Sequence, residues 1–451
     1  MKFNLSNIKF GLSLFIVISV FLGCDNKLAP MNQYQVTPPD LSKRSIFESF
    51  SPDSGGIGTQ LIIRGKNFGS DPEYVTVTVN NKVAPIVRMD DEMIYAIVPA
   101  RADTGYVRLY IGKGDNVEEY ASDHKFRYQF KRNVTTMVGQ QGMKGRDDGP
   151  YAASKLQRTW FLLTDKDGTV FFIDEGRGTD KNGALRRARN GEVETLVQCS
   201  TGPFQSPTAL AFSPNQDTLY ISNYCFTDET NTRTDFNILY VTREGGFVDV
   251  RGLSRGTKIG TTGIAVHPKT GEVFFSNKGD GYIWRYVGPG FEDYEKLFQV
   301  NNATSVETRM MFNPEGTILY VVVCNRHCIY KVPYDATTRT FGIPSLFVGA
   351  WDESGYMNGS GATVRLNQPR QPAFDEDGNM FVPEKSAHII RKITPAGVAS
   401  LYAGIPEQSG FGDGLPELAK FNSPECVTVY PDNSVYVADR ENHVIRRVTV
   451  E

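Results

Sequence analysis

The 451-residue chain has little of several features that mark common protein classes. Lys and Arg total 48 against 51 Asp and Glu, so no basic excess is available to neutralise phosphates, and we expect no nucleic-acid partner. Five His in the whole chain leave little room for a histidine-rich metal site. The apolar run near the start is too short to span a hydrocarbon core of about 30 Å.

The residues that are abundant indicate a β-rich fold. The chain contains 43 Gly, 24 Pro and 12% aromatic residues, which favours many short strands joined by tight turns. At about 150 residues per domain, the length suggests two or three domains. We therefore predict an all-β protein of more than one domain.

The first 44 residues are predicted to direct and tether the chain. Residues 1–23 have a positive start and 11 mostly apolar residues from Leu12 to Leu22, typical of a secretory signal peptide. Phe21-Leu22-Gly23-Cys24 resembles the lipobox of bacterial lipoproteins, which implies cleavage before Cys24 and anchoring to a membrane by lipid alone. An incidental cysteine after a plain signal peptide is the alternative. Residues 24–44 would then be the lipidated cysteine and a polar, flexible tether.

The other cysteines match no zinc pattern and are odd in number, so they cannot all pair. They are Cys199, Cys225, Cys324, Cys328 and Cys426. Cys324 and Cys328 could pair or hold a metal with His327. We favour two core thiols on either side of a turn, because a strand-turn-strand pattern surrounds them.

Residues 45–129 are predicted to form a small β-sandwich. Alternating runs such as Val75–Val79 are separated by turn clusters such as Asn80-Asn81. The segment 51–69, with its GKNFG ending, and the later Ile97–Ala100 resemble the IPT/TIG family of immunoglobulin-like domains. The resemblance implies a spacer or interaction platform without chemistry of its own.

Residues 130–451 contain an internal repeat, and its period predicts the fold. Aromatic anchors recur every 46 to 61 residues, a spacing that suits one four-stranded propeller blade per repeat. The anchors are Phe171, Tyr220, Phe274, Tyr320, Phe381 and Tyr436. Six anchors predict a six-bladed β-propeller.

The closing units resemble the NHL repeat family of β-propellers. The resemblance rests on Asp439, Asn442-His443 and Ile445-Arg446 and on the lead-in from Gly412 to Pro424. The chain ends one strand short of a full blade, whereas residues 133–138 match the outer strand of another unit. We predict that residues 133–138 supply the missing outer strand of the last blade, which would leave no exposed edge.

The sequence offers no constellation that points to catalysis. His388 and His443 occupy one repeat position, and Glu384 and Asp439 another, so we expect them to bond the turns between strands. The family includes lyases and lactonases with a metal in the central channel, but no cluster here singles out such a site. No serine-nucleophile, phosphate-loop or HExxH motif occurs. We therefore predict a non-enzyme without metal or other cofactor.

Aromatic residues in the connections between strands are the candidate ligand contacts. A ring flanked by polar side chains suits a sugar, whose CH face packs on the ring while its hydroxyls bond the neighbours. The candidates are Trp351, Tyr356, Phe411, Tyr224 and Trp160. Packing between blades is the alternative for each, and we prefer packing for Trp284, which aligns with Arg391 and Arg446 on a strand.

The combination of lipid anchor, IPT/TIG module and NHL propeller resembles lipoproteins of Bacteroidetes that are associated with polysaccharide uptake. The resemblance implies a non-catalytic, outer-membrane, cell-surface protein whose propeller loops bind an oligosaccharide or polysaccharide. One alternative is a scaffold that contacts an outer-membrane transporter. A propeller lyase or hydrolase with a channel metal is the other.

Overall fold

The computed structural model describes residues 36–130, 132–175, 183–199, 204, 206–224, 236–254, 260–288, 290 and 293–450. The chain divides into two compact units. One holds residues up to Ser54 together with Gly58–Arg127, and the other holds Gly55–Ile57 and Tyr128 onward. The predicted signal peptide, Cys24 and Cys225 lie outside the described residues. No helix in the described part of the chain is both long and apolar enough to cross a membrane.

The smaller unit is a β-sandwich of two antiparallel sheets, as predicted. The first sheet orders β1 (Ile46–Ser51), β3 (Gln60–Lys66), β7 (Met93–Ile97) and β6 (Ile86–Met89). The second orders β2 (Ser54–Gly55), β9 (Asn116–Tyr128), β8 (Gly105–Lys113), β4 (Val75–Val79) and β5 (Lys82–Ala84), and a 3-10 turn, η1 (Pro72–Tyr74), precedes β4. Alternating residues of these strands, such as Val77, Val107 and Leu109, are fully buried between the sheets.

The start of the described chain lies along this sandwich. The Thr37 N–H donates to Ser70 Oγ at 2.8 Å, and the Asp40 N–H donates to Asn67 Oδ1 at 2.9 Å. The side-chain amide of Asn67 returns bonds to the carbonyls of Asp40 and Lys43. This part of the predicted tether is therefore held against the sandwich.

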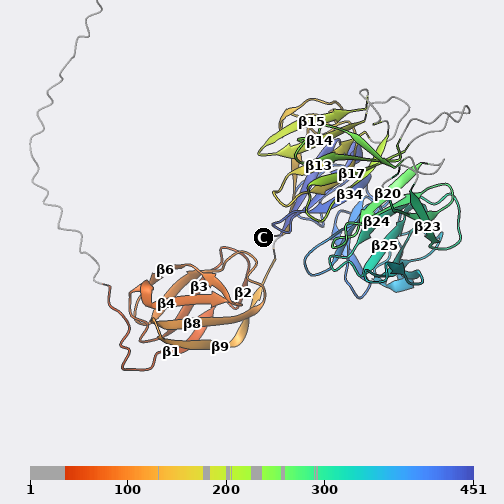
Figure 1. Cartoon of the computed structure of the whole chain (residues 1–451). Coiled ribbons are helices and arrows are strands. Elements are labelled where there is room, and N and C mark those ends of the chain that lie inside the picture. The colour runs from red at the N-terminus through yellow and green to blue at the C-terminus, as the bar shows by residue number, and fades with distance from the viewer. Residues whose placement is uncertain are drawn as a thin grey trace, which may run out of the picture. The chain divides into compact units, whose positions relative to one another are not determined.

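The larger unit consists of six antiparallel sheets arranged as blades around a common centre (Figure 1). Blade 1 orders β12 (Thr159–Thr164), β13 (Val170–Asp174), β14 (Ala184–Arg189), β15 (Glu192–Gln198) and β11 (Gly149–Pro150). Blade 2 orders β16 (Pro207–Phe212), β17 (Thr218–Asn223), β18 (Ile238–Thr242) and β19 (Arg251–Ser254). Blade 3 orders β20 (Thr261–Val266), β21 (Val273–Asn277), β22 (Tyr282–Tyr286) and β23 (Tyr294–Gln299).

Blades 4 to 6 complete the ring. Blade 4 orders β24 (Thr308–Phe312), β25 (Ile318–Val323), β26 (Cys328–Asp335) and β28 (Ser345–Gly349), with β27 (Thr340–Phe341) also on β26. Blade 5 orders β30 (Ala373–Phe374), β31 (Met380–Glu384), β32 (Ile389–Ile393), β33 (Val398–Ala403) and β29 (Gly359–Ser360). Blade 6 orders β34 (Pro424–Val429), β35 (Val435–Asp439), β36 (Val444–Val450) and β10 (Arg132–Val138). Single 3-10 turns lie in the connections at η2 (Cys324–Arg326), η3 (Gly361–Thr363) and η4 (Arg440–Asn442).

The last blade closes the ring in the predicted way. Strand β10 pairs antiparallel with β36, from Arg132 opposite Val450 to Val138 opposite Ile445. Val134 of β10 is fully buried against Val427, Val437 and Val448 of the same blade. The prediction that residues 133–138 supply the missing outer strand is confirmed.

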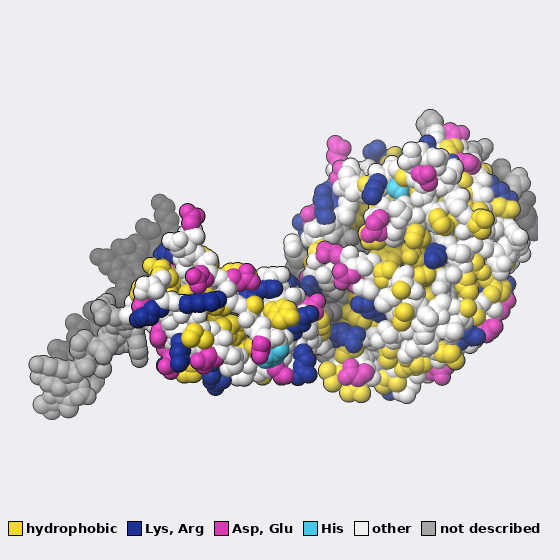
Figure 2. All heavy atoms as spheres, turned by 90° about the horizontal axis from the view of Figure 1, so that it is seen from below, with side chains coloured by type: hydrophobic (Ala, Val, Ile, Leu, Met, Phe, Trp, Pro, Cys, Tyr) yellow, Lys and Arg dark blue, Asp and Glu magenta, His cyan; other side chains and the backbone are white. Residues whose placement is uncertain are grey.

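The aromatic anchors all lie on the second strand of their blades, which confirms the count of six. Five of them are buried, and the sixth, Tyr220, packs against the core of blades 1 to 3. Cys324, the first residue of η2, and Cys328, the first residue of β26, are buried, unpaired thiols at the two ends of this turn, as expected. Cys199 and Cys426 are also buried and free. Figure 2 shows acidic and basic side chains mixed over the visible face of both units, with hydrophobic side chains gathered in the middle of the larger one.

Candidate functional site at the centre of the propeller

The propeller has two ends of different character. The first strand of each blade lines the centre of the propeller, and we call it the inner strand. Because neighbouring strands are antiparallel, each inner strand begins where the second strand of its blade ends, as Thr159 opposite Asp174 shows in blade 1. The connections between blades and the turns after the second strands therefore gather at this end, which we call the loop face. The opposite end, where the inner strands finish in short hairpins, is the hairpin face.

Three blades contain a buried ion pair that ties the loop face together. Asp174 lies 2.7 Å from Arg186, and Asp439 lies 3.0 Å from Arg446, with both partners of each pair fully buried. Glu384 and Arg391 form the third pair at 3.3 Å. Each carboxylate also accepts a backbone N–H from the segment that enters its own blade, such as Asn422 N–H to Asp439 Oδ1 at 2.7 Å. These blade pairs satisfy their charges internally, so Glu384 and Asp439 bond the turns as predicted.

Histidines connect the turns after the second strands of blades 4, 5 and 6 to the next blade. His388 accepts the Ser423 N–H on Nδ1 at 3.1 Å, and His327 accepts the Gln368 N–H at 3.1 Å. His443 contacts the Gln157 carbonyl, which joins the last blade to the first. Burial lowers the pKa of His388 and of His327, which favours the neutral ring that an accepting Nδ1 requires. The structural role predicted for His388 and His443 is confirmed.

Two of the predicted ligand-binding rings cover the arginines of blade pairs. Tyr356 lies over Arg391 with 4.9 Å from Cζ to the ring centre, and Phe411 lies over Arg446 at 4.6 Å. Both residues belong to the segments that precede their blades, at the loop face. A sugar contact through either ring remains a prediction, since each ring already packs within its own blade.

The other candidates also lie at the loop face, at different depths. Trp351 is half-buried after β28, with its ring against Tyr330 and beside Arg326. Tyr224 follows β17, and its ring lies so near Gly260 that a Cβ there would come within 2.2 Å of it. Trp160 is 8% exposed at the start of β12. The five candidates therefore share an end of the propeller without forming one surface, and their ligand role stays a prediction.

Trp284 packs within blade 3, as expected. It lies opposite Phe275, the position that Arg391 and Arg446 hold opposite Val382 and Val437 in their blades. Its ring meets Tyr294 edge-on at 5.5 Å between ring centres.

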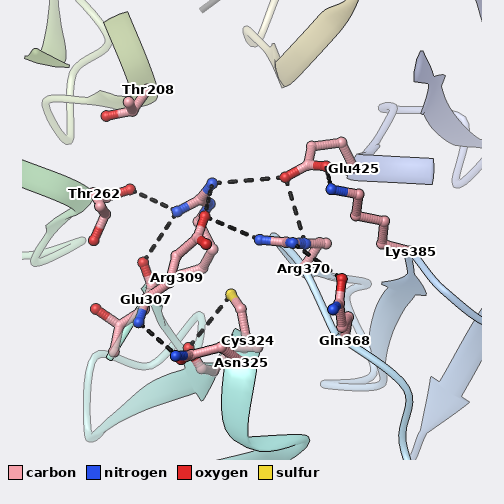
Figure 3. Close-up of polar contacts among 12 residues, drawn as sticks. Thr208, Thr262, Glu307, Arg309, Cys324, Asn325, Gln368, Arg370, Lys385 and Glu425 are labelled. Carbon is pink, nitrogen blue, oxygen red and sulfur yellow. Dashed lines mark hydrogen bonds and ion pairs between the residues drawn. The ribbon is translucent and has the colours of Figure 1, made fainter. Parts of the chain in front are cut away.

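A polar cluster occupies the axis of the propeller at the loop face (Figure 3). It consists of Glu307, Arg309, Arg370, Lys385 and Glu425, which we call the axial cluster. Arg309 of blade 4 approaches Glu425 of blade 6 to 3.7 Å, a contact between blades that are not neighbours and therefore one made across the axis. Arg370 contacts both acids of the cluster, 3.0 Å from Glu307 and 3.5 Å from Glu425. Lys385 approaches Glu425 to 3.9 Å.

The inner strands of four blades begin with a β-bulge, and one of these bulges carries Glu425 of the cluster. The pairing register skips one residue at the start of the inner strands of blades 1, 2, 3 and 6. The skipped residues are Trp160, Thr208, Thr262 and Glu425. Bulges turn a side chain out of the regular pleat and are common beside functional sites. Sequence reasoning identified only Trp160 here, because a bulge leaves no periodic signal in a strand this short.

The axial cluster is charged and incompletely satisfied. Neither carboxylate oxygen of the fully buried Glu425 accepts a hydrogen bond from a described residue. The Nε atoms of Arg309 and Arg370 likewise donate no hydrogen bond to any described residue. Burial lowers the pKa of Lys385, and Arg370 and Arg440 lower it further against the opposing effect of Glu425. Burial raises the pKa of the neighbouring Cys324 thiol to about 11, so this thiol is protonated at neutral pH.

Below the cluster, toward the hairpin face, the channel is an apolar cavity of about 320 Å³. All six inner strands line it, with residues such as Leu162, Phe312 and Val427. No group of three or more His, Cys, Asp or Glu side chains suited to a metal ion occurs in the described ranges. The chemistry that the channel offers is therefore hydrogen bonding and charge at one end and apolar contact below it.

The fold and this site define a class of protein, an IPT/TIG domain followed by an NHL-type six-bladed propeller with a polar axis. The family model of the IPT/TIG domain matches residues 45–128, and that of the NHL repeat matches residues 421–447. Among curated proteins, the chain is 25% identical over 154 residues to NHL repeat-containing protein 2 of Gallus gallus, covering 32% of this chain and 20% of that protein. It is 22% identical over 268 residues to Protein SUPPRESSOR OF QUENCHING 1, chloroplastic, of Arabidopsis thaliana, covering 54% and 25%. The chain thus spans a quarter or less of these two relatives.

Solved structures match nearly the whole described chain. It is similar to an auxiliary nutrient binding protein from Bacteroides thetaiotaomicron VPI-5482, with 27% identity and a TM-score of 0.64, covering 92% of this chain and 99% of that one. An auxiliary nutrient binding protein from Bacteroides ovatus ATCC 8483 shares the fold, with 24% identity, a TM-score of 0.66 and coverage of 92% and 100%. The two-part architecture is therefore shared along its full described length.

Proposed function

We propose that this chain is a non-catalytic, lipid-anchored protein of the bacterial outer membrane that binds an oligosaccharide nutrient at the loop face of its propeller. The observation that carries the proposal is the end-to-end similarity to the auxiliary nutrient binding protein of B. thetaiotaomicron. The lipobox-like Cys24 supports the anchor, and the sandwich would hold the propeller away from the membrane.

The chemistry of the propeller supports binding without turnover. The repeated acids and histidines, Glu384, Asp439, His388 and His443, are occupied in bonds that hold blades and turns together. Cys324, a thiol beside the axial cluster, is held protonated by burial. A rigid scaffold with polar groups converging at one end is instead typical of a ligand site.

Calorimetric titration of the purified chain against neutral and acidic oligosaccharides of plant and host origin tests the proposal. We expect saturable binding to at least one glycan without change in its reducing-end concentration over hours. Trp351→Ala should weaken this binding if the predicted ring contact exists, and Trp284→Phe, which alters a ring packed within blade 3, is the matched control. A panel without any binding would refute the nutrient role, and steady release of reducing ends would refute the non-catalytic one.

The membrane anchor has its own test. Wild-type chain expressed in a Bacteroides host should partition with outer-membrane vesicles and be labelled by an impermeant reagent on whole cells. Cys24→Ser should release it, because the proposed lipid attachment requires Cys24. Membrane association that survives Cys24→Ser would contradict lipid anchoring.

A further inference from the structure

We propose that the axial cluster selects acidic sugars by binding their oxyanion group, a uronate carboxylate or a sulfate ester. This inference rests on the proposed function and names its ligand class. It is carried by the charge of the cluster, the loose pairing of Glu425 and the exposure of Lys385.

The first observation is an excess of positive charge at the axis. The three cations of the cluster, Arg309, Arg370 and Lys385, face two carboxylates, an excess of one positive charge. Arg440, which is paired with Glu441 at 2.8 Å, lies near Lys385. The chain as a whole is net negative, with 48 basic against 51 acidic residues. A focused positive potential in a low-dielectric site on a negative protein attracts an anion to that site specifically.

The second observation is that Glu425 is held more loosely than the carboxylates of the blade pairs, the longest of which is Glu384–Arg391 at 3.3 Å. Arg186–Asp174 and Arg446–Asp439 meet at 2.7 and 3.0 Å, the range of charge-assisted hydrogen bonds. Arg309–Glu425, Arg370–Glu425 and Lys385–Glu425 lie at 3.7, 3.5 and 3.9 Å, and Glu425 accepts no hydrogen bond from a described residue. The arginines of the blade pairs thus donate hydrogen bonds to their carboxylates, whereas Arg309, Arg370 and Lys385 make none to Glu425.

The third observation is that part of the cluster reaches solvent on the loop face. The Lys385 side chain is 26% exposed and that of Glu307 is 15% exposed, above the buried Arg309 and Arg370. Arg440 is 13% exposed, and its Cζ lies 4.7 Å from the ring centre of the buried Trp160, which holds the guanidinium in place. Lys385 would contact the oxyanion, with Arg440 beside it.

Calorimetry with three hexasaccharides tests the inference on the full chain. The probes are hexagalacturonate, which carries carboxylates only, a κ-carrageenan hexasaccharide, which carries sulfates only, and neutral maltohexaose. We expect at least one acidic probe to bind more tightly than the neutral one. Lys385→Gln should weaken that binding at least tenfold, because it removes a charge-assisted bond. Lys269→Gln, which removes an exposed lysine at the hairpin face, should not change it.

A second variant gives an effect of opposite sign. Glu307→Gln keeps the shape of the side chain and removes a negative charge, so it should tighten binding of the acidic probe. Loss of binding in Lys385→Gln without tightening in Glu307→Gln would contradict an electrostatic site. Equal binding of acidic and neutral probes, unaffected by both variants, would overturn the inference and leave the nutrient role intact. Binding of no saccharide of either charge would overturn both.

Discussion

Removing the arginine of a blade pair should destabilise the propeller strongly. Arg446 is fully buried and donates to Asp439, to the carbonyls of Gly412 and Lys420, and to Asp413. In Arg446→Met the aliphatic stem is retained between its aromatic neighbours, but Asp439 keeps only the Asn422 and Asn442 N–H donors. An uncompensated buried charge costs about 3–5 kcal/mol of unfolding free energy.

The neighbouring residue provides a matched control. Arg447, next on the same strand, pairs with Asp432 at a half-exposed position, where side-chain exposures are 36% and 40%. Arg447→Met should therefore cost only about 0–1 kcal/mol. Urea unfolding followed by tryptophan fluorescence measures both, because all three tryptophans lie in the propeller and none in the sandwich.

The deficit of Arg446→Met should also depend on pH. Burial raises the pKa of Asp439 to about 6 even with Arg446 opposing it, and without the arginine it should rise further. Folding of the variant then takes up a proton, so its deficit should shrink as the pH falls from 8 to 5. The reasoning fails if Arg446→Met is no less stable than Arg447→Met at pH 8.

Three further predictions concern the rest of the propeller. An Nδ1 that accepts a hydrogen bond must be neutral, and burial lowers the pKa of His388. The contribution of His388 to the free energy of unfolding should therefore be present above pH 6.5 and lost as the pH falls. His388→Gln should reduce this acid sensitivity in urea titrations. Val134→Ala should cost about 2–3 kcal/mol by leaving a gap behind the closing strand, whereas Asn133→Ala, at an exposed site of that strand, should be near neutral. Since the pKa of Lys385 is lowered, affinity for an acidic glycan should fall at alkaline pH, and Lys385→Arg should retain it. An acid sensitivity of His388→Gln equal to that of the wild type would contradict the histidine argument. Equal stability of Val134→Ala and Asn133→Ala would contradict the closing-strand argument. A loss of affinity at alkaline pH that persists in Lys385→Arg would contradict the lysine argument.

Much of the fold follows from local patterns in the sequence. The aromatic anchors recur because every blade packs the same position of its second strand into the core, fully in five blades and partly at Tyr220. Each repeat therefore indicates a blade by its own sequence alone. The closing role of residues 133–138 was also readable, since their pattern matches an outer strand that the last unit lacks. Asp439 and His443 were recognised as turn-bonding residues for the same reason, because true repeat positions serve the scaffold.

The axial cluster is different, because its members share no local pattern. Glu307, Arg309, Arg370, Lys385 and Glu425 come from three blades and differ at equivalent positions of the repeat, so the spacing along the chain says nothing about their meeting. Sequence reasoning placed the ligand site on loop aromatics instead, and two of those, Tyr356 and Phe411, cover buried arginines. Strand periodicity alone determined that there would be six blades. Only closure of the ring, which brings blades 4 and 6 within ion-pair distance across an axis, decided that these charged side chains would meet there.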